Sequence, residues 1–100
     1  MQVNISAKHM ELTEPIESYI RKKAERLKRH FDRLQQINVV VDRQAGHGFH
    51  VEILADVERH ADFVANATHD DLYACIDLVV DRTTRQLTDH KERVRDNHGH

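Results

Sequence analysis

The chain has 100 residues and a formal net charge of −2, with 15 lysines and arginines against 17 aspartates and glutamates. That length makes a single domain with one modest core, which aliphatic side chains must fill because there are only three Phe, two Tyr and no Trp residues. The single cysteine excludes an intramolecular disulfide and indicates a reducing cytoplasm. With no long apolar run and no start typical of a signal peptide, the sequence predicts a cytoplasmic protein without membrane contact.

Charge is distributed unevenly along the chain. Residues 18–33 hold seven lysines and arginines against two carboxylates, whereas residues 38–81 hold two arginines against nine carboxylates. Residues 82–100 are basic again, with five cations against three carboxylates. Such segregation is typical of a molecule with one basic side, and a basic side attracts phosphate. Our working hypothesis is therefore that the two basic runs form one polyanion-binding surface.

The first quarter of the chain predicts a strand followed by a helix. Residues 3–7 alternate between apolar and polar side chains, which is typical of a strand. A helix is predicted from about Glu14 to about His30, because Thr13 suits an N-cap and Pro15 is tolerated in a first turn. At three- and four-residue spacing, one predicted apolar face consists of Ile16, Ile20, Ala24, Leu27, Phe31 and Leu34.

Three further strands are predicted in the middle of the chain. Residues 37–41 and 49–57 alternate clearly, and residues 63–67 alternate more weakly. Between the first two of these strands, Ala45-Gly46-His47-Gly48 predicts a tight turn, because glycine adopts positive φ without strain.

A long helix is predicted to end the chain. His69-Asp70-Asp71 places carboxylates where a helix cap and the helix dipole favour them. The predicted buried stripe consists of Leu72, Ile76, Val79, Val80, Thr83, Leu87, His90 and Val94. Because a βαβ crossover has a fixed hand, the order βαβββα predicts an α+β domain over residues 1–96, with a four-stranded sheet and two helices packed on one face. Residues 97–100 are expected to form a disordered tail.

A basic stripe runs along the first predicted helix. Lys22, Arg26, Arg29 and Arg33 fall within about 60° of one another at helical spacing. Any soluble helix has a charged face, so a merely solvated surface remains one interpretation. Like charges four residues apart destabilise a helix, however, which favours a missing anionic partner.

The last helix gives a more ambiguous pattern. Arg82, Gln86, Asp89 and Arg93 cluster on one flank of its buried stripe, and Lys91 lies on the other. The i,i+4 ladder Asp81–Arg85–Asp89–Arg93 alternates in sign and can stabilise a solvated helix without any ligand. A binding role is favoured only if basic residues of both helices face a shared groove, where Lys23 and His30 would also lie.

The sequence predicts no metal site, no cofactor and no enzyme activity. The nine histidines include no HExxH motif and no four-ligand spacing, and the chain has neither a GxSxG motif nor a glycine-rich phosphate loop. Cys75 lies beside the predicted buried stripe, which indicates an inert thiol. For His30 and His90 we hypothesise that mild acidification charges both side chains and strengthens anion binding.

Several residue runs together resemble one known family. They are Met1–Ser6, Leu12–Ile16 with Tyr19 and Lys23, Arg26–Arg33, and Asp71–Asp77 followed by Arg82, Arg85-Gln86-Leu87 and His90-Lys91. With these runs, the chain resembles the ribosome hibernation promoting factor family, which includes the ribosome-associated inhibitor A (protein Y), over essentially its whole length. Asp89 departs from the pattern, because the family tends to carry a basic residue there.

The resemblance implies both a function and a set of contact residues. It implies the same βαβββα fold, binding to the small ribosomal subunit in the decoding channel, and inhibition of translation in stationary phase or stress. The residues that it implies as rRNA contacts are Lys22, Lys23, Arg26, Arg29, His30, Arg82, Arg85, Gln86, Lys91 and Arg93. Because the sequence ends just after the last helix, we expect the short type, monomeric off the ribosome, which in some bacteria acts with a separate ribosome modulation factor.

Two other function classes stay open at the level of sequence. A sheet with two helices on one face is also typical of a general double-stranded-RNA-binding domain. Alternatively, the acidic middle of the chain can make the sheet a protein-interaction surface for a basic partner. An RNA-processing enzyme is the least favoured class, because the sequence contains no catalytic grouping.

Overall fold

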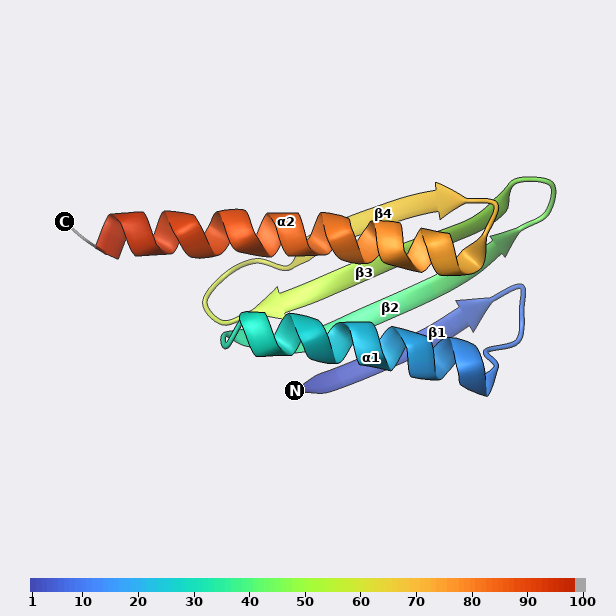
Figure 1. Cartoon of the computed structure of the whole chain (residues 1–100), viewed down its shortest axis with the longest axis horizontal. Helices are drawn as coiled ribbons and strands as arrows, with labels where there is room; N and C mark the ends of the chain where they lie inside the picture. Colours follow the sequence, from blue (N-terminus) through green and yellow to red (C-terminus); the bar gives the residue numbers. More distant parts are fainter. Residues whose placement is uncertain (99–100) are drawn as a thin grey trace.

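Six elements follow one another along the chain, and the structure, a computed structural model, describes residues 1–98. The elements are β1 (Gln2–Lys8), α1 (Glu14–His30), β2 (Leu34–Gln44), β3 (Gly48–Val57), β4 (Phe63–His69) and α2 (Leu72–His98) (Figure 1). The predicted order βαβββα and the predicted bounds of the first helix are confirmed. α2 extends through His98, and residues 99–100 of the expected tail lie outside the described residues.

The four strands form one sheet in the order β1-β2-β3-β4, with β1 and β2 parallel and the other neighbours antiparallel. A parallel pair requires a crossover, and α1 supplies it on the same face of the sheet that α2 covers (Figure 1). The register aligns Ile5, Val39, Ile53 and Ala65 in one row across the sheet, on the helix-covered face. The predicted α+β fold with both helices on one face is therefore confirmed.

Aliphatic side chains from the two helices and the sheet fill the space between the layers. Ile20, Ala24 and Leu27 of α1 are buried against the sheet, as the helical spacing predicts. Cys75 of α2 is completely buried, with its Sγ 3.3 Å from the carbonyl oxygen of Ala67. Burial raises the pKa of this thiol, so it stays protonated and is a poor nucleophile, which supports the prediction of an inert cysteine.

α2 is longer than the sheet beneath it. Its last turns extend beyond the strands (Figure 1), and residues 91–95 are all exposed. The prediction that Val94 belongs to the buried stripe is wrong, since this side chain is 42% exposed. Helical periodicity continues past the point where the sheet ends and no surface remains to bury it. Neither α1 nor the described part of α2 is long and apolar enough to cross a membrane.

Backbone conformation fixes the ends of the elements. Asp71 begins α2 by accepting a hydrogen bond from the backbone N–H of Tyr73 on its Oδ1, at 3.1 Å, which confirms the predicted acidic cap. Thr13 occupies the N-cap position of α1, although its hydroxyl makes no capping hydrogen bond. In the β2–β3 turn, Gly46 and Gly48 have φ of +77° and +78°, as the turn prediction requires.

The two turn glycines differ in their surroundings, and this difference predicts different mutant stabilities. A Cβ at Gly48 would lie 2.7 Å from the carbonyl oxygen of His69, whereas a Cβ at Gly46 would have no neighbour within 4 Å. Gly46→Ala should therefore cost about 1 kcal/mol of unfolding free energy for its positive φ alone. Gly48→Ala should cost clearly more, because the backbone of β4 must also move. Urea denaturation of both variants checks this, and equal losses would contradict it.

Candidate nucleic-acid interface

The two helices lie side by side on the sheet (Figure 1). Residues of both helices line a groove between them. One part, of about 200 Å³, is lined by Lys23, Arg26 and His30 of α1 and by Asp81 and Thr84 of α2. A wider part, of about 450 Å³, continues from His30 and Thr84 to Thr88, Lys91, Glu92 and Arg95. The predicted shared groove therefore exists, and four of the ten predicted contact residues line it: Lys23, Arg26, His30 and Lys91.

Lys23 is tied to α2 at one end of the interface. Its Nζ lies 3.3 Å from the Oδ1 of Asp77 and 5.3 Å from the centre of the Tyr19 ring. Tyr19 donates its hydroxyl to the same Asp77 oxygen at 2.5 Å, and its ring meets that of Tyr73 edge-on at 5.0 Å. We call these four residues the interhelical clamp. The hydrogen bond to Asp77, and secondarily burial, raises the pKa of Tyr19 to about 12, so the hydroxyl remains a donor at physiological pH.

Lys91 joins the helices at the other end of the interface. Its Nζ donates to the carbonyl oxygen of His30 at 3.1 Å and lies 5.7 Å from the centre of the Phe31 ring. The carbonyl belongs to the last residue of α1, which has no partner within its own helix. Lys91 therefore satisfies the C-terminus of α1 and places its positive charge at the negative end of the helix dipole.

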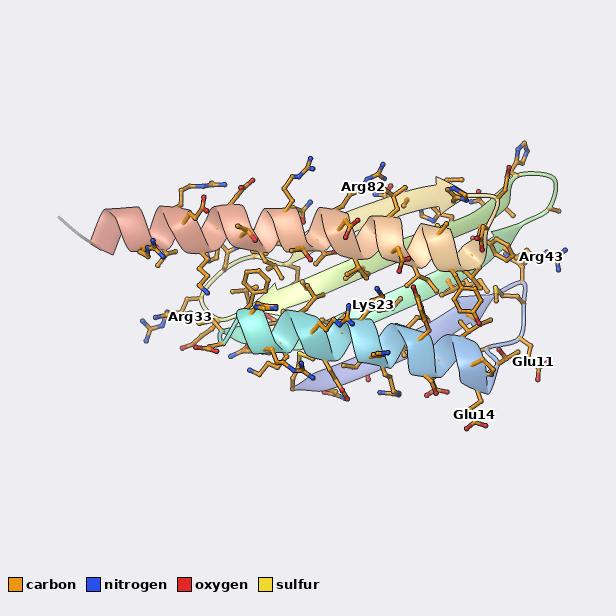
Figure 2. The ribbon with its side chains drawn as sticks, in the orientation of Figure 1. Glu11, Glu14, Lys23, Arg33, Arg43 and Arg82 are labelled. Atoms are coloured by element: carbon orange, nitrogen blue, oxygen red, sulfur yellow. The ribbon has the colours of Figure 1, made fainter. Side chains whose placement is uncertain are left out.

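Arg82 and Gln86 do not face the groove, contrary to the expectation that the basic residues of both helices share it. Arg82 donates from Nη1 to the carbonyl oxygen of Asn66 at 2.5 Å, and Gln86 donates from Nε2 to that of Val64 at 3.0 Å. Both carbonyls belong to β4, which is an edge strand of the sheet. Figure 2 shows Arg82 on the side of α2 away from α1. Helical spacing places Arg93 on this same flank.

Arg21 of α1 makes a similar approach at the opposite edge of the sheet. Its Nη1 lies 3.4 Å from the carbonyl oxygen of Val3 in β1, and its Nη2 lies 3.1 Å from Glu17. Side chains from the two helices thus reach the outer carbonyls of both edge strands.

The remaining predicted cations are exposed to solvent. They are Lys22, Arg26 and Arg29 on α1 and Arg85 and Arg93 on α2, with His30 also exposed. Among the described side chains, none of these residues has a carboxylate within 4 Å, so the predicted ladder from Asp81 to Arg93 is not closed by ion pairs. Their charges are therefore available to an external anion.

Arg33 departs from the predicted helical stripe, and Arg95 was missed. α1 ends at His30, and Arg33 lies in the short connection to β2 rather than one turn further along the helix. Arg95 lines the wider part of the groove together with Lys91. Its position four residues after Lys91, on the same face of α2, was a signal that could have identified it.

His90 lies under the last turns of α2 in an aromatic cluster. Its ring centre is 4.5 Å from that of His60 and 5.3 Å from that of Phe63, and the latter two rings stack at 4.4 Å. Desolvation lowers the pKa of His90, and His60, Arg93 and Arg33 lower it further. The hypothesis that His90 becomes a cation on mild acidification is therefore disfavoured, because its surroundings resist the charge.

No metal site is found among the described residues: no three His, Cys, Asp or Glu side chains there are grouped so that they could hold an ion. The fold and the exposed cations instead define an α+β domain with exposed cations on its two-helix face.

The family described as "Sigma 54 modulation protein / S30EA ribosomal protein" matches residues 3–95, and the chain belongs to this family. The ribosome hibernation promoting factor of Azotobacter vinelandii is 41% identical over 96 residues, with 93% of this chain and 85% of that protein covered. The protein of the same name from Escherichia coli is 33% identical, with 95% and 98% covered. The predicted resemblance is therefore confirmed.

Two solved structures are similar to this one. The N-terminal domain of Thermus thermophilus Protein Y is 32% identical, has a TM-score of 0.76 and covers 87% of this chain and 96% of that one. A ribosomal subunit interface protein from Coxiella burnetii is 18% identical, has a TM-score of 0.81 and covers 92% and 99%, and at that identity it supports the fold alone.

The lowered pKa of His90 predicts a pH-dependent stability. Because the folded protein holds this ring neutral, the unfolded chain binds more protons once the pH falls to about 6.5, the ordinary histidine pKa. The unfolding free energy should therefore decrease from pH 7.5 to 5.5, and it should decrease less in His90→Gln. Urea denaturation at both pH values measures the difference. His47→Gln is the matched control, since His47 is exposed in the β2–β3 turn and should leave the wild-type loss unchanged; an equal loss in His90→Gln would contradict the assignment.

Proposed function

We propose that this protein binds the small ribosomal subunit in the decoding channel, with the outward face of α1 and α2 against rRNA. Bound there, the domain occupies space that mRNA and tRNA need, and it inhibits translation by steric exclusion in stationary phase or stress. It acts in the cytoplasm, is monomeric off the ribosome, and in some bacteria such a protein works with a separate ribosome modulation factor. Membership of the family, whose similar relatives carry the name ribosome hibernation promoting factor, supports the ribosome as the partner.

The observation that carries this proposal is the set of exposed cations without carboxylate neighbours. Lys22, Arg26 and Arg29 on α1 and Arg85 on α2 are exposed and make no described ion pair. Each cation that neutralises a phosphate releases condensed counterions, which favours binding most at low salt. Arginine additionally matches phosphate with two parallel hydrogen bonds.

The predicted contact residues divide into two groups with different roles. Lys23 already forms an ion pair with this chain, and Arg82, Gln86 and Lys91 already donate hydrogen bonds to its carbonyl oxygens. We assign them mainly to positioning, because using them on RNA would break an existing contact. The residues left free for direct phosphate contact are Lys22, Arg26, Arg29, His30, Arg85 and Arg93.

The opposite face of the sheet supports one orientation of the bound domain. Asp42, Glu52 and Asp56 alternate with buried residues of β2 and β3 and therefore lie on the face away from the helices. This face repels phosphate, while the helix face attracts it. A prefolded domain with oppositely charged faces docks in one orientation and loses little conformational entropy on binding.

Reversing two free cations tests the proposal. Arg29→Glu with Arg85→Glu should abolish co-sedimentation with small subunits in a sucrose gradient and relieve inhibition in an in vitro translation assay. The milder Arg29→Gln and Arg85→Gln should each lower the slope of log affinity against log salt by about 1, because one phosphate contact is lost.

Lys8→Glu with Arg43→Glu is the matched control, because both residues are exposed, lie on the sheet and carry the same charge change. This control should sediment with small subunits like the wild type. Binding that survives the helix-face reversal would overturn the proposed interface. Equal affinity for free duplex RNA and for ribosomes would instead favour a general double-stranded-RNA-binding domain.

A further inference from the structure

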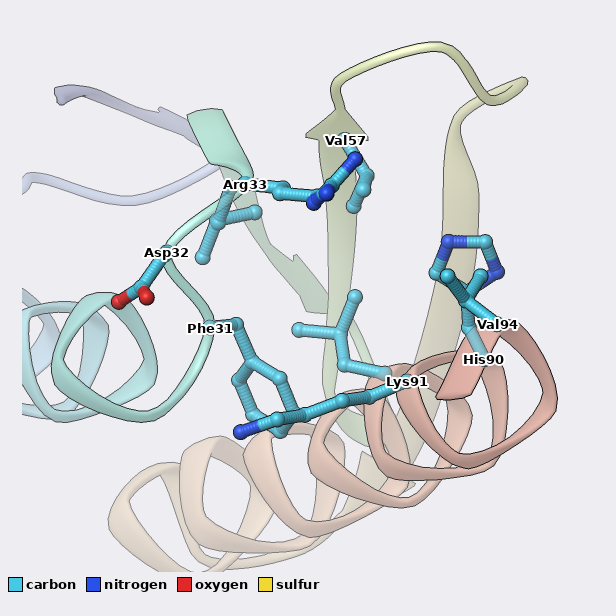
Figure 3. Close-up of a pocket in the computed structure, with 9 residues that line it drawn as sticks. Phe31, Asp32, Arg33, Val57, His90, Lys91 and Val94 are labelled. Atoms are coloured by element: carbon cyan, nitrogen blue, oxygen red, sulfur yellow. The ribbon is translucent and has the colours of Figure 1, made fainter. Parts of the chain in front are cut away.

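A cavity lies next to the interhelical groove, between the end of α1, the end of the sheet and the later turns of α2 (Figure 3). Its volume is about 140 Å³. The last turns of α2 extend beyond the strands at this end of the molecule (Figure 1), and Val94 is 42% exposed there. The apolar part of its lining comes from Phe31, Leu34, Val57, Leu87 and Val94.

Aromatic rings stand on two sides of this cavity. Phe31, just after α1, and His90 of α2 point into it from opposite sides (Figure 3). The rings of His60 and Phe63 pack against His90. Burial lowers the pKa of His90, so at pH 7 it is a neutral ring that offers one nitrogen donor and one acceptor. The space therefore suits a flat ring that carries hydrogen-bonding groups at its edge.

The volume limits the size of that ring. An apolar protein cavity of about 150 Å³ holds one benzene molecule, which is a useful scale for a single six-membered ring. A pyrimidine base is of this class, while a purine adds a second ring. The cavity of about 140 Å³ thus favours a single-ring heterocycle.

Charged side chains also line the cavity. Two of them are cations, Arg33 and Lys91. Asp32 is a carboxylate in the lining. Lys91 directs its Nζ to the carbonyl oxygen of His30. Arg33 is therefore the lining cation left to hold an anionic group beside an inserted ring.

From the volume of this cavity, the aromatic rings on two of its sides and the guanidinium group in its lining, we propose that it binds one unstacked pyrimidine nucleotide of RNA, with Arg33 on a flanking phosphate. Unstacked bases in single-stranded segments are recognised by stacking on aromatic side chains and by contacts to their edges. This inference rests on the proposed function for its RNA partner, and it adds to the phosphate-binding helix face a contact that senses a base.

Nucleotide binding to the intact protein tests the cavity proposal directly. In two-dimensional NMR at fixed ionic strength, UMP should shift the amide signals of Phe31, His90 and Val94 saturably. AMP should do so at least tenfold more weakly, and ribose 5-phosphate should shift only signals near Arg33. Equal responses to UMP and ribose 5-phosphate would overturn the proposal, because charge alone would then explain binding.

Val94→Trp alters the cavity but changes no charge. It therefore tests the contribution of the cavity to binding separately from that of the cationic helix face. The larger side chain should fill the cavity and weaken UMP binding at least tenfold, while the thermal midpoint changes little because Val94 is exposed. Val64→Trp is the matched control: Val64 is 47% exposed, against 42% for Val94, and lies in β4. Undiminished UMP shifts in Val94→Trp would place the ligand elsewhere and overturn the assignment.

Two further comparisons show whether the base comes from RNA or from a free nucleotide, and whether the cavity proposal or the proposed function has failed. A uridine oligonucleotide should bind at least tenfold more tightly than UMP; equal affinities would indicate a free nucleotide and overturn the RNA assignment. Val94→Trp should also weaken binding to small subunits. If Val94→Trp binds subunits like the wild type while Arg29→Glu with Arg85→Glu does not, the cavity proposal fails and the proposed function stands. If UMP fills the cavity but the charge reversal leaves subunit binding intact, the proposed function fails instead.

Discussion

The polar connections between α1 and α2 set the geometry on which the rest of the molecule depends. The interhelical clamp joins the helices near the start of α2, and Lys91 joins them at the end of α1. Two separated connections fix both the distance between the helices and their relative direction, which one connection would not do. Apolar packing on the sheet holds each helix down, but it resists sliding along the sheet less strongly than directional hydrogen bonds do.

The cations of this domain consequently fall into two groups, those that contact the protein itself and those that are exposed without a partner among its described residues. Lys23, Lys91 and Arg82 each satisfy a carboxylate or a backbone carbonyl of the protein itself. Arg29 and Arg85 are exposed without such a partner. The first group orients the framework from which the second group projects. A low net charge of −2 is compatible with a cationic surface for this reason, since the carboxylates of β2 and β3 lie on the other face.

Periodicity in the sequence was sufficient for the elements and for their order. Alternation located the strands, and helical spacing with Thr13 and Pro15 placed the bounds of α1. Periodicity could not predict that Val94 is exposed, because it carries no information about where the opposing sheet ends. Periodicity also wrongly grouped Arg82 with the groove residues. A helical wheel shows on which side of a helix a residue lies, but it does not show which element packs against that side. The tie between Lys23 and Asp77 joins residues 54 positions apart, and only the folded chain shows that these charges offset each other.

The edges of the sheet have a consequence for how the protein behaves at high concentration. A free strand edge is a template on which another chain can add a strand, and exposed edges promote aggregation. Here Arg82 and Gln86 donate to outer carbonyls of β4, and Arg21 approaches that of Val3 in β1. Intermolecular strand pairing must first displace these side chains, at a cost in desolvated charge. The helices thus supply side chains that compete with intermolecular strand pairing at both edges of the sheet.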